Sequence, residues 1–274
     1  MKGVWRRPGT YLVTIYIAIH VVFVAFPILW LVLGSIKSRF AALRSPPTLI
    51  FEPTYEAFQK IFAGGLVDVF GNSVTIGAIN VALALLLGVP AAYALARMRG
   101  PARKNIAFWI LSIRFAPAFG LVIPLYALMR GLGLLDTLAA VVIAHLTINL
   151  PFAIWLMMSY FDDLPVETEE AAVIDGASRF QVLWHVLLPV SGPMLVAVSM
   201  LVFVFSWNEF LFAFILTSSD AQTVPALIAS LAGTMSFDWP LISALSVAAL
   251  LPALLVVVIA QRFITKGLTM GSVQ

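Results

Sequence analysis

Six long runs of apolar residues constrain this chain more than any other feature. A helix needs about 20 mainly apolar residues to cross the hydrocarbon core of a membrane, and every run is at least that long. Helices satisfy their backbone hydrogen bonds internally, as lipid requires. The sequence therefore predicts an all-α membrane protein, built as one domain, with six transmembrane helices at residues 11–36, 71–96, 105–129, 137–160, 193–217 and 241–264.

The composition indicates that lipid, rather than water, is the main solvent. Of the 274 residues, 62% are hydrophobic and only 11% are charged, whereas soluble domains are about 45–50% apolar and about 25% charged. A soluble fold of this length needs more charged side chains than these to cover its surface. The net charge of +3 does not indicate a nucleic-acid partner, because the basic residues lie between the apolar runs, where they set membrane orientation.

The Lys and Arg residues also predict which side each loop faces. Six spans place both termini on one face, and that face carries most of the basic residues, including those in the segment 97–104. Because an excess of Lys and Arg marks cytoplasmic loops, both termini and the segment 161–192 are predicted to be cytoplasmic. The first run exceeds the about 7–15 apolar residues of a signal peptide, which favours an uncleaved first span.

The segment 161–192 has the pattern of a helix, a break and a second helix. Pro165 suits a first helical turn, where acidic side chains complement the helix dipole. Gly176 readily adopts a left-handed conformation and ends a helix, and Ser178 is a typical N-cap for the next one. The second helix carries an exposed apolar stripe with helical spacing, which needs a partner surface: Phe180, Leu183, Trp184 and Leu187.

The same segment resembles the signature of bacterial and archaeal ABC importer permeases. Glu170-Ala171-Ala172 is followed by three residues and then Gly176, and nine residues separate Gly176 from Val186-Leu187-Leu188-Pro189. The one departure is Val186 in place of Ile. Other runs resemble the maltose-type carbohydrate permeases, specifically the second, smaller permease of the unlike pair: Pro124-Leu125-Tyr126, Leu132-Gly133-Leu134-Leu135-Asp136-Thr137, Asn149-Leu150-Pro151-Phe152, Trp207-Asn208-Glu209-Phe210 and Gly267-Leu268-Thr269-Met270-Gly271.

The resemblance implies the type I ABC importer permease fold with a cytoplasmic coupling helix. In that family two permeases form the pore, two ATP-binding-cassette ATPase subunits lie beneath them, and an extracytoplasmic solute-binding protein delivers the sugar. The chain would then move a sugar or polyol into the cytoplasm across the plasma (inner) membrane of a bacterium or archaeon. It has no phosphate-binding loop. We therefore expect no enzyme activity and no cofactor in this chain, with ATP and Mg bound by the partner ATPases.

The resemblance also assigns residues to the docking of the ATPases. Glu170 is expected to pair with a basic group on the ATPase, and Gly176 to permit the turn between the two helices. The tail 269–274 is expected to reach toward the ATPases. The full set of expected coupling residues is Glu170, Ala171, Ala172, Asp175, Gly176, Ala177, Phe180 and Pro189.

Four polar residues inside the apolar runs are candidates for the substrate pathway: Arg114, Asn149, Asn208 and Glu209. Charged groups inside a membrane are costly and mark candidate functional sites. The alternative is a structural role, in which they form salt bridges or hydrogen bonds between helices; for Asn208 and Glu209 this is the favoured interpretation. His145 is expected to form a hydrogen bond between helices. No His, Asp and Glu residues have the spacing of metal ligands.

Three other functions are compatible with parts of the pattern. The signature of the segment 161–192 is shared by ABC permeases for other small solutes, so the carbohydrate assignment rests on the flanking motifs. An ion-coupled secondary transporter or channel would explain the spans, but it would have no need for an amphipathic helix pair in one loop. A membrane-embedded enzyme would need clustered catalytic residues near one interface, and the sequence shows none.

Overall fold

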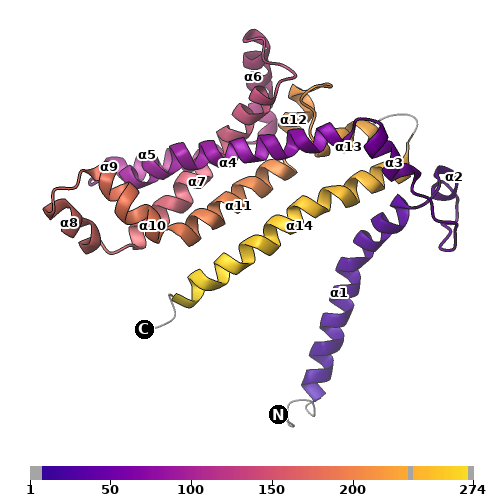
Figure 1. Ribbon diagram of the computed structural model, residues 1–274, viewed down its shortest axis with the longest axis horizontal. Coiled ribbons are helices and arrows are strands. Elements are labelled where there is room, and N and C mark those ends of the chain that lie inside the picture. Colours follow the sequence, from indigo (N-terminus) through magenta and orange to yellow (C-terminus); the bar gives the residue numbers. More distant parts are fainter. Residues whose placement is uncertain (1–7, 234–236, 271–274) are drawn as a thin grey trace. The chain divides into compact units, whose positions relative to one another are not determined.

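The computed structural model describes residues 8–233 and 237–270, and every regular element in these ranges is helical. Four helices are long and apolar enough to cross a membrane, and up to six spans result if each of two bent helix pairs is counted as one. The chain divides into two compact units, and Figure 1 labels the helices that they contain. The first comprises the chain up to Val67 with Leu231–Leu251, and the second comprises Asp68–Ser230 and the chain from Pro252. Residues 271–274 of the predicted coupling tail lie outside the described residues.

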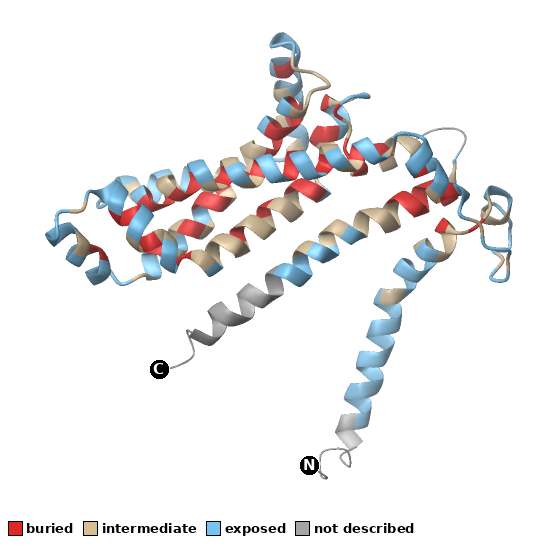
Figure 2. Cartoon of the chain, in the orientation of Figure 1, coloured by how far each residue is buried: buried red, intermediate tan, exposed pale blue. Residues whose placement is uncertain are grey.

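The first unit contains three helices and the beginning of a fourth: α1 (Pro8–Ser35), α2 (Arg39–Ala42), α3 (Glu56–Ala63) and α14 (Trp239–Met270). The described part of α1 is exposed along most of its length (Figure 2), although its mean hydropathy is 2.5. Gly34 near its end lies close to α14, because a Cβ at this position would be 2.7 Å from the hydroxyl oxygen of Ser243. So apolar and exposed a helix requires lipid or another protein around it.

The second unit is built around α7 (Leu138–Asp163), half of whose apolar stretch is buried. It contains α4 (Val67–Ala96), α5 (Pro101–Arg114), α6 (Ala118–Gly131), α8 (Glu167–Ile174), α9 (Arg179–Gln181), η2 (Val182–Leu187), α10 (Leu188–Val190), α11 (Gly192–Asn208), α12 (Leu211–Leu216) and α13 (Val224–Ala232). Small residues allow the spanning helices to approach closely. A Cβ added at Gly88 of α4 would lie 3.4 Å from the Cβ of Ala153 in α7.

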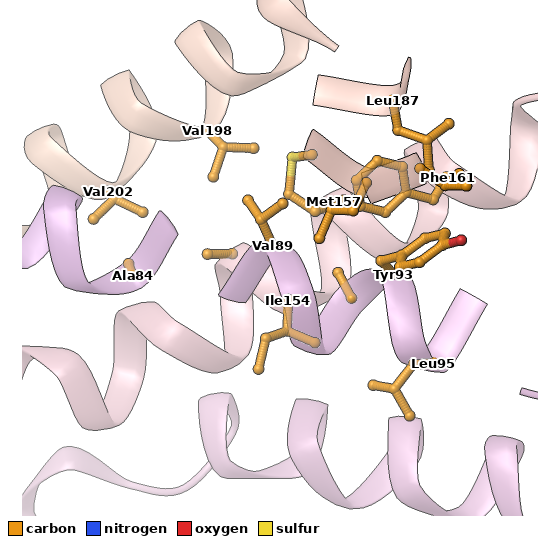
Figure 3. Close-up of a cluster of buried hydrophobic side chains, with 14 residues drawn as sticks. Ala84, Val89, Tyr93, Leu95, Ile154, Met157, Phe161, Leu187, Val198 and Val202 are labelled. Carbon is orange, nitrogen blue, oxygen red and sulfur yellow. The ribbon is translucent and has the colours of Figure 1, made fainter. Parts of the chain in front are cut away.

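A cluster of buried apolar side chains joins α4, α7, η2 and α11 (Figure 3). Val89 of α4, Met157 of α7 and Val198 of α11 belong to it, together with Leu183 and Leu187 of η2. The helical segment that follows α7 is therefore packed onto the same core as the spanning helices.

The third predicted span is not one continuous helix. The prediction of a helix over 105–129 is wrong, because α5 ends at Arg114, α6 begins at Ala118, and the two are bent by 87°. Proline has no N–H to donate and disfavours helical geometry in the residue before it. Pro117 lies in the break, and the N–H groups of Phe115 and Ala116 close the last turn of α5 with shorter-range hydrogen bonds.

The fifth predicted span is also interrupted. A continuous helix over 193–217 is wrong, because α11 ends at Asn208 and α12 begins at Leu211. Glu209 is extended, and its carboxylate accepts hydrogen bonds from the N–H groups of Phe212 and Ala213 at 3.0 and 3.2 Å. An acidic side chain satisfies the free N–H groups of a helix start in this way, so Glu209 ends one helix and starts the next.

Candidate functional site

The segment 161–192, hereafter the coupling segment, has the predicted helix–break–helix form. Its first helix, α8, ends at Ile174, and Gly176 follows with a φ of +90°, a region that glycine enters without steric cost. The Ser178 hydroxyl accepts the N–H of Gln181 at 3.3 Å, and the Gln181 side chain accepts the N–H of Ser178 at 2.8 Å. This capping box confirms the predicted start of the second helix.

The apolar stripe of the second helix is divided between two roles. Phe180 and Trp184 are 66% and 45% exposed, with their rings 5.9 Å apart. Leu183 and Leu187 are only 2% and 1% exposed, so the prediction that the whole stripe is exposed is wrong for these two. They lie in η2, which has π-helical hydrogen bonding rather than the α-helical form assumed for the stripe, and they pack into the core of the second unit.

Most of the expected coupling residues lie on the surface of the described chain. Ala172 and Ala177 are partly buried and pack against the core cluster. Ile174, which is not in the expected set, is 85% exposed and adds to the apolar surface. The remaining expected residues are exposed: Glu170, Ala171, Asp175, Gly176, Phe180 and Pro189.

Glu169 is not among the expected coupling residues, yet it forms a buried ion pair in this segment. Its side chain is 1% exposed, and its Oε1 accepts a hydrogen bond from Nε of Arg97 at 2.8 Å and another from Nη2 of the same guanidinium. Its Oε2 accepts the hydroxyl of Tyr93 at 3.0 Å and lies 4.0 Å from Nη1 of Arg179. Three acids share the first turn of α8, so composition alone could not tell which one points inward.

At the other end of α7, Asp136 holds two loops together. It has a φ of +58°, and its carboxylate accepts the N–H groups of four consecutive residues and two hydroxyls: Ser218, Ser219, Asp220 and Ala221. Burial alone would raise the pKa of the Asp136 carboxyl. The hydrogen bonds from Ser218, Ala221 and Asp220 outweigh burial and hold the pKa far below its ordinary value.

Three of the four predicted pathway residues line one cavity of about 310 Å³ in the second unit: Arg114, Asn149 and Glu209. The fourth, Asn208, does not, and its amide donates to the carbonyl of Val204 within its own helix at 2.8 Å. The cavity is also lined by His145 and Phe205. The structure thus brings three of the four predicted pathway residues together with His145.

Arg114 lies at the end of α5, beside the break before α6. Its guanidinium lies between two rings, 4.7 Å from the centroid of Phe152 and 4.4 Å from that of Phe205. Stacking of this kind suits the flat, weakly hydrated guanidinium. Its Nη1 approaches the carbonyl of Ile148 at 3.5 Å, and no carboxylate among the described residues forms an ion pair with it.

The remaining polar side chains of the cavity connect helices. His145 of α7 contacts the hydroxyl of Ser206 at 2.8 Å and the carboxylate of Glu209 at 2.9 Å, as expected for a hydrogen-bond partner between helices. The amide of Asn149 donates to the side chain of Asn80 in α4 at 2.9 Å. Glu209 and Asn149 therefore have structural contacts and also present polar atoms to the cavity. Among the described residues, no group of three His, Cys, Asp or Glu side chains could hold a metal ion.

Comparison with known proteins assigns this arrangement to a family. Residues 84–269 match the family described as binding-protein-dependent transport system inner membrane component. The chain belongs to this family. Over 252 residues it is 35% identical to the probable ABC transporter permease protein y4oR of Sinorhizobium fredii, covering 91% of this chain and 90% of that protein. Over another 252-residue alignment it is 34% identical to the trehalose transport system permease protein SugB of Mycobacterium tuberculosis, covering 90% and 92%.

The permease also shares its fold with solved ABC importers. A chain from the crystal structure of a bacterial ABC transporter involved in the import of alginate superposes with a TM-score of 0.78 at 23% sequence identity. The match covers 96% of the permease and 99% of that chain. The ABC importer permease fold implied by Glu170-Ala171-Ala172 and its downstream glycine is therefore confirmed. The permease is a multi-pass membrane protein and a transport component.

Proposed function

We propose that this permease forms one half of a pore through which an ABC importer moves a sugar or polyol into the cytoplasm. A second permease forms the other half, a binding protein delivers the solute from outside, and two ATPase subunits bind ATP and Mg on the cytoplasmic side. The observation that carries this proposal is the coupling segment. It presents an apolar surface formed by Ile174, Phe180 and Trp184, while its other face is packed onto the spanning helices.

The coupling segment is suited to receive movement from an ATPase. Exposed apolar surface beside charged groups is typical of a protein–protein interface. Glu167 and Glu170 are exposed in the first turn of α8, so Glu170 is free to meet a basic group of the ATPase while Phe180 enters an apolar cleft. The orientation with both termini in the cytoplasm places this surface on the side where ATP is available.

The proposed solute class rests on the relatives and on the cavity. The relative SugB is named for trehalose transport, and the structural neighbour comes from a transporter described as importing alginate. The cavity offers the guanidinium of Arg114, the amide of Asn149 and the ring of Phe205. Hydroxyl groups bond to the first two, and the apolar face of a sugar ring packs on the third. These residues are the proposed contribution of this permease to the solute pathway.

The coupling role is tested by removing its docking contact and its turn. Glu170→Ala and Gly176→Pro should each abolish ATP-driven uptake into proteoliposomes that contain the complete transporter, while the variants still enter the membrane. Gly176→Pro acts through the backbone, because proline cannot adopt a φ of +90°. Asp163→Ala, an exposed acid at the end of α7, is the matched control and should transport normally. Normal uptake by both test variants would remove the coupling role.

A further inference from the structure

The adjacent acids of α8, Glu169 and Glu170, point to different sides of the helix and differ in burial. Glu169 is buried and Glu170 is exposed, as expected for consecutive residues that are about 100° apart around a helix. Both oxygens of Glu169 already have donors from within this chain. Glu169 therefore has no free face for an ATPase, whereas Glu170 has one.

Glu169 is the only one of the eight residues of α8 that is buried. Ala172 packs partly against the core cluster, but an alanine buries little apolar surface. The attachment of α8 to the rest of the molecule therefore combines this one buried carboxylate with contacts between α8 and η2. An ion pair in such a place is strong when the geometry is good and further donors satisfy the carboxylate, and both conditions hold for Arg97 and Tyr93.

The partners of Glu169 come from the end of a spanning helix and from the second arm of the coupling segment. Tyr93 is in the last turns of α4 and Arg97 directly follows that helix, while Arg179 begins α9, beyond the turn at Gly176. The ring of Tyr93 also packs edge-on against Phe161 near the end of α7, with ring centroids 6.0 Å apart (Figure 3). One carboxylate thus lies where α4, α7, α8 and α9 meet.

We propose that Glu169 is a positioning residue: its ion pair with Arg97 fixes the coupling segment to the end of α4, so that α8 and the spanning helix move as one body. This inference rests on the proposed coupling function and adds the connection inside the permease. Docking of the ATPase then belongs to Glu170 and the exposed apolar residues. Transmission of its movement into the membrane belongs to Glu169 and Arg97.

Loss of the connection has a different consequence from loss of docking. Without Glu169 the ATPase still binds the outer face of the coupling segment, but α8 moves without carrying α4 with it. ATP is then hydrolysed with little transport. Without Glu170 the ATPase contact itself is weakened, so copurification and transport fall together. The ratio of ATP hydrolysed to solute transported separates the two cases.

The test uses the complete transporter in proteoliposomes with its binding protein. Glu169→Gln keeps the size of the side chain and removes the charge, and Arg97→Gln removes the charge from the other partner. We expect each to lower uptake by at least about tenfold, because breaking a buried ion pair costs several times the free energy of one tenfold step. ATPase subunits should still copurify, and ATP hydrolysed per transported solute should rise. Glu167→Gln, on the exposed side of the same turn, is the matched control and should change neither quantity.

A charge reversal provides the second arm of the test. Glu169→Arg and Arg97→Glu should each reduce coupling as single variants, and the double variant should recover at least part of the uptake because it restores an opposite pair. Unchanged uptake and unchanged ATP use in Glu169→Gln would overturn the inference. The inference would also be overturned if Glu169→Gln lost ATPase copurification to the same extent as Glu170→Ala. If Glu170→Ala and Gly176→Pro transport normally, the proposed coupling function fails instead.

Discussion

Asp136 lies before and Glu169 after α7, a 26-residue helix about 39 Å long, and each residue fixes a loop by a different means. The partners of Asp136 are backbone N–H groups and hydroxyls of residues 218–221. The partners of Glu169 are long side chains from other elements, chiefly Arg97 and Tyr93. The first arrangement is made within two short turns and has little freedom. The second joins separate helices through their side chains.

The two connections, one at each end of α7, differ in how much ordering of side chains they require. Backbone N–H groups held in a turn are already oriented toward the carboxylate, so the Asp136 connection needs little ordering of side chains. The Glu169 connection orders flexible side chains and removes a charge pair from water, and the hydrogen bonds of the pair must offset both costs. Asp136 therefore holds its loops through oriented backbone groups, whereas the connection proposed to transmit movement, at Glu169, depends on side chains.

The largest effect is expected from reversing the charge of Arg97. Arg97→Glu places a second carboxylate against the buried Glu169, and breaking such a pair costs about 3–5 kcal/mol. The midpoint of thermal unfolding of the permease in detergent should fall by many degrees. Arg99→Glu, two residues away and exposed, is the control and should leave the midpoint nearly unchanged. Equal midpoints for the two variants would mean that the side-chain connection does not stabilise the fold.

A smaller effect is expected from neutralising Asp136. Asn keeps the shape and tolerates the positive φ of this position, and Asp136→Asn removes the charge together with one of the two acceptor oxygens. Hydrogen bonds to a charged group contribute about 1.5–3 kcal/mol, and neutral bonds about half as much. The remaining amide oxygen still accepts hydrogen bonds, and the substitution brings no like charge next to a buried carboxylate, so the unfolding midpoint should fall by less than in Arg97→Glu. A larger fall than in Arg97→Glu would reverse the comparison between the two ends.

The smallest effect is the pH dependence of the Asp136 connection. The folded pKa of this carboxyl lies below its unfolded value of about 3.9. Its contribution to stability is therefore fully present above the unfolded pKa and is lost as pH falls toward the folded pKa. The difference in unfolding midpoint between the wild-type permease and Asp136→Asn should stay constant from about pH 7 to pH 5 and shrink below about pH 4. A difference that grows on acidification would contradict the sign of this shift.

The sequence predicted those parts of the fold that local patterns determine. The apolar runs located α1, α4, α7 and α14 to within a few residues at most ends, and glycine and serine chemistry located the turn at Gly176 and the cap at Ser178. These features depend on neighbours within one or two turns. The membership in an importer family followed from the fixed spacing between Glu170 and Pro189.

Other features depend on contacts between residues that are distant in the sequence, so local patterns could not predict them. Pro27 and Pro90 lie inside long helices, so a proline in an apolar run does not by itself predict a break. The bend of 87° beside Pro117 could therefore not be predicted from the proline alone. Glu209 interrupts a helix because its carboxylate meets His145 from α7 and the next helix start. The inward direction of Glu169 depends on Arg97, which lies 72 residues earlier.

Disulfide crosslinking tests most directly whether the coupling segment docks an ATPase subunit, because this chain contains no cysteine of its own. Single substitutions Ile174→Cys and Phe180→Cys, each in the complete transporter with cysteines placed along the cleft of the ATPase, allow disulfide crosslinking in the membrane. We expect both positions to crosslink to an ATPase subunit, whereas Ile50→Cys, an exposed position in the first unit, should not. Crosslinking at neither Ile174 nor Phe180, with active and assembled transporter, would contradict the claim that the coupling segment is the docking surface.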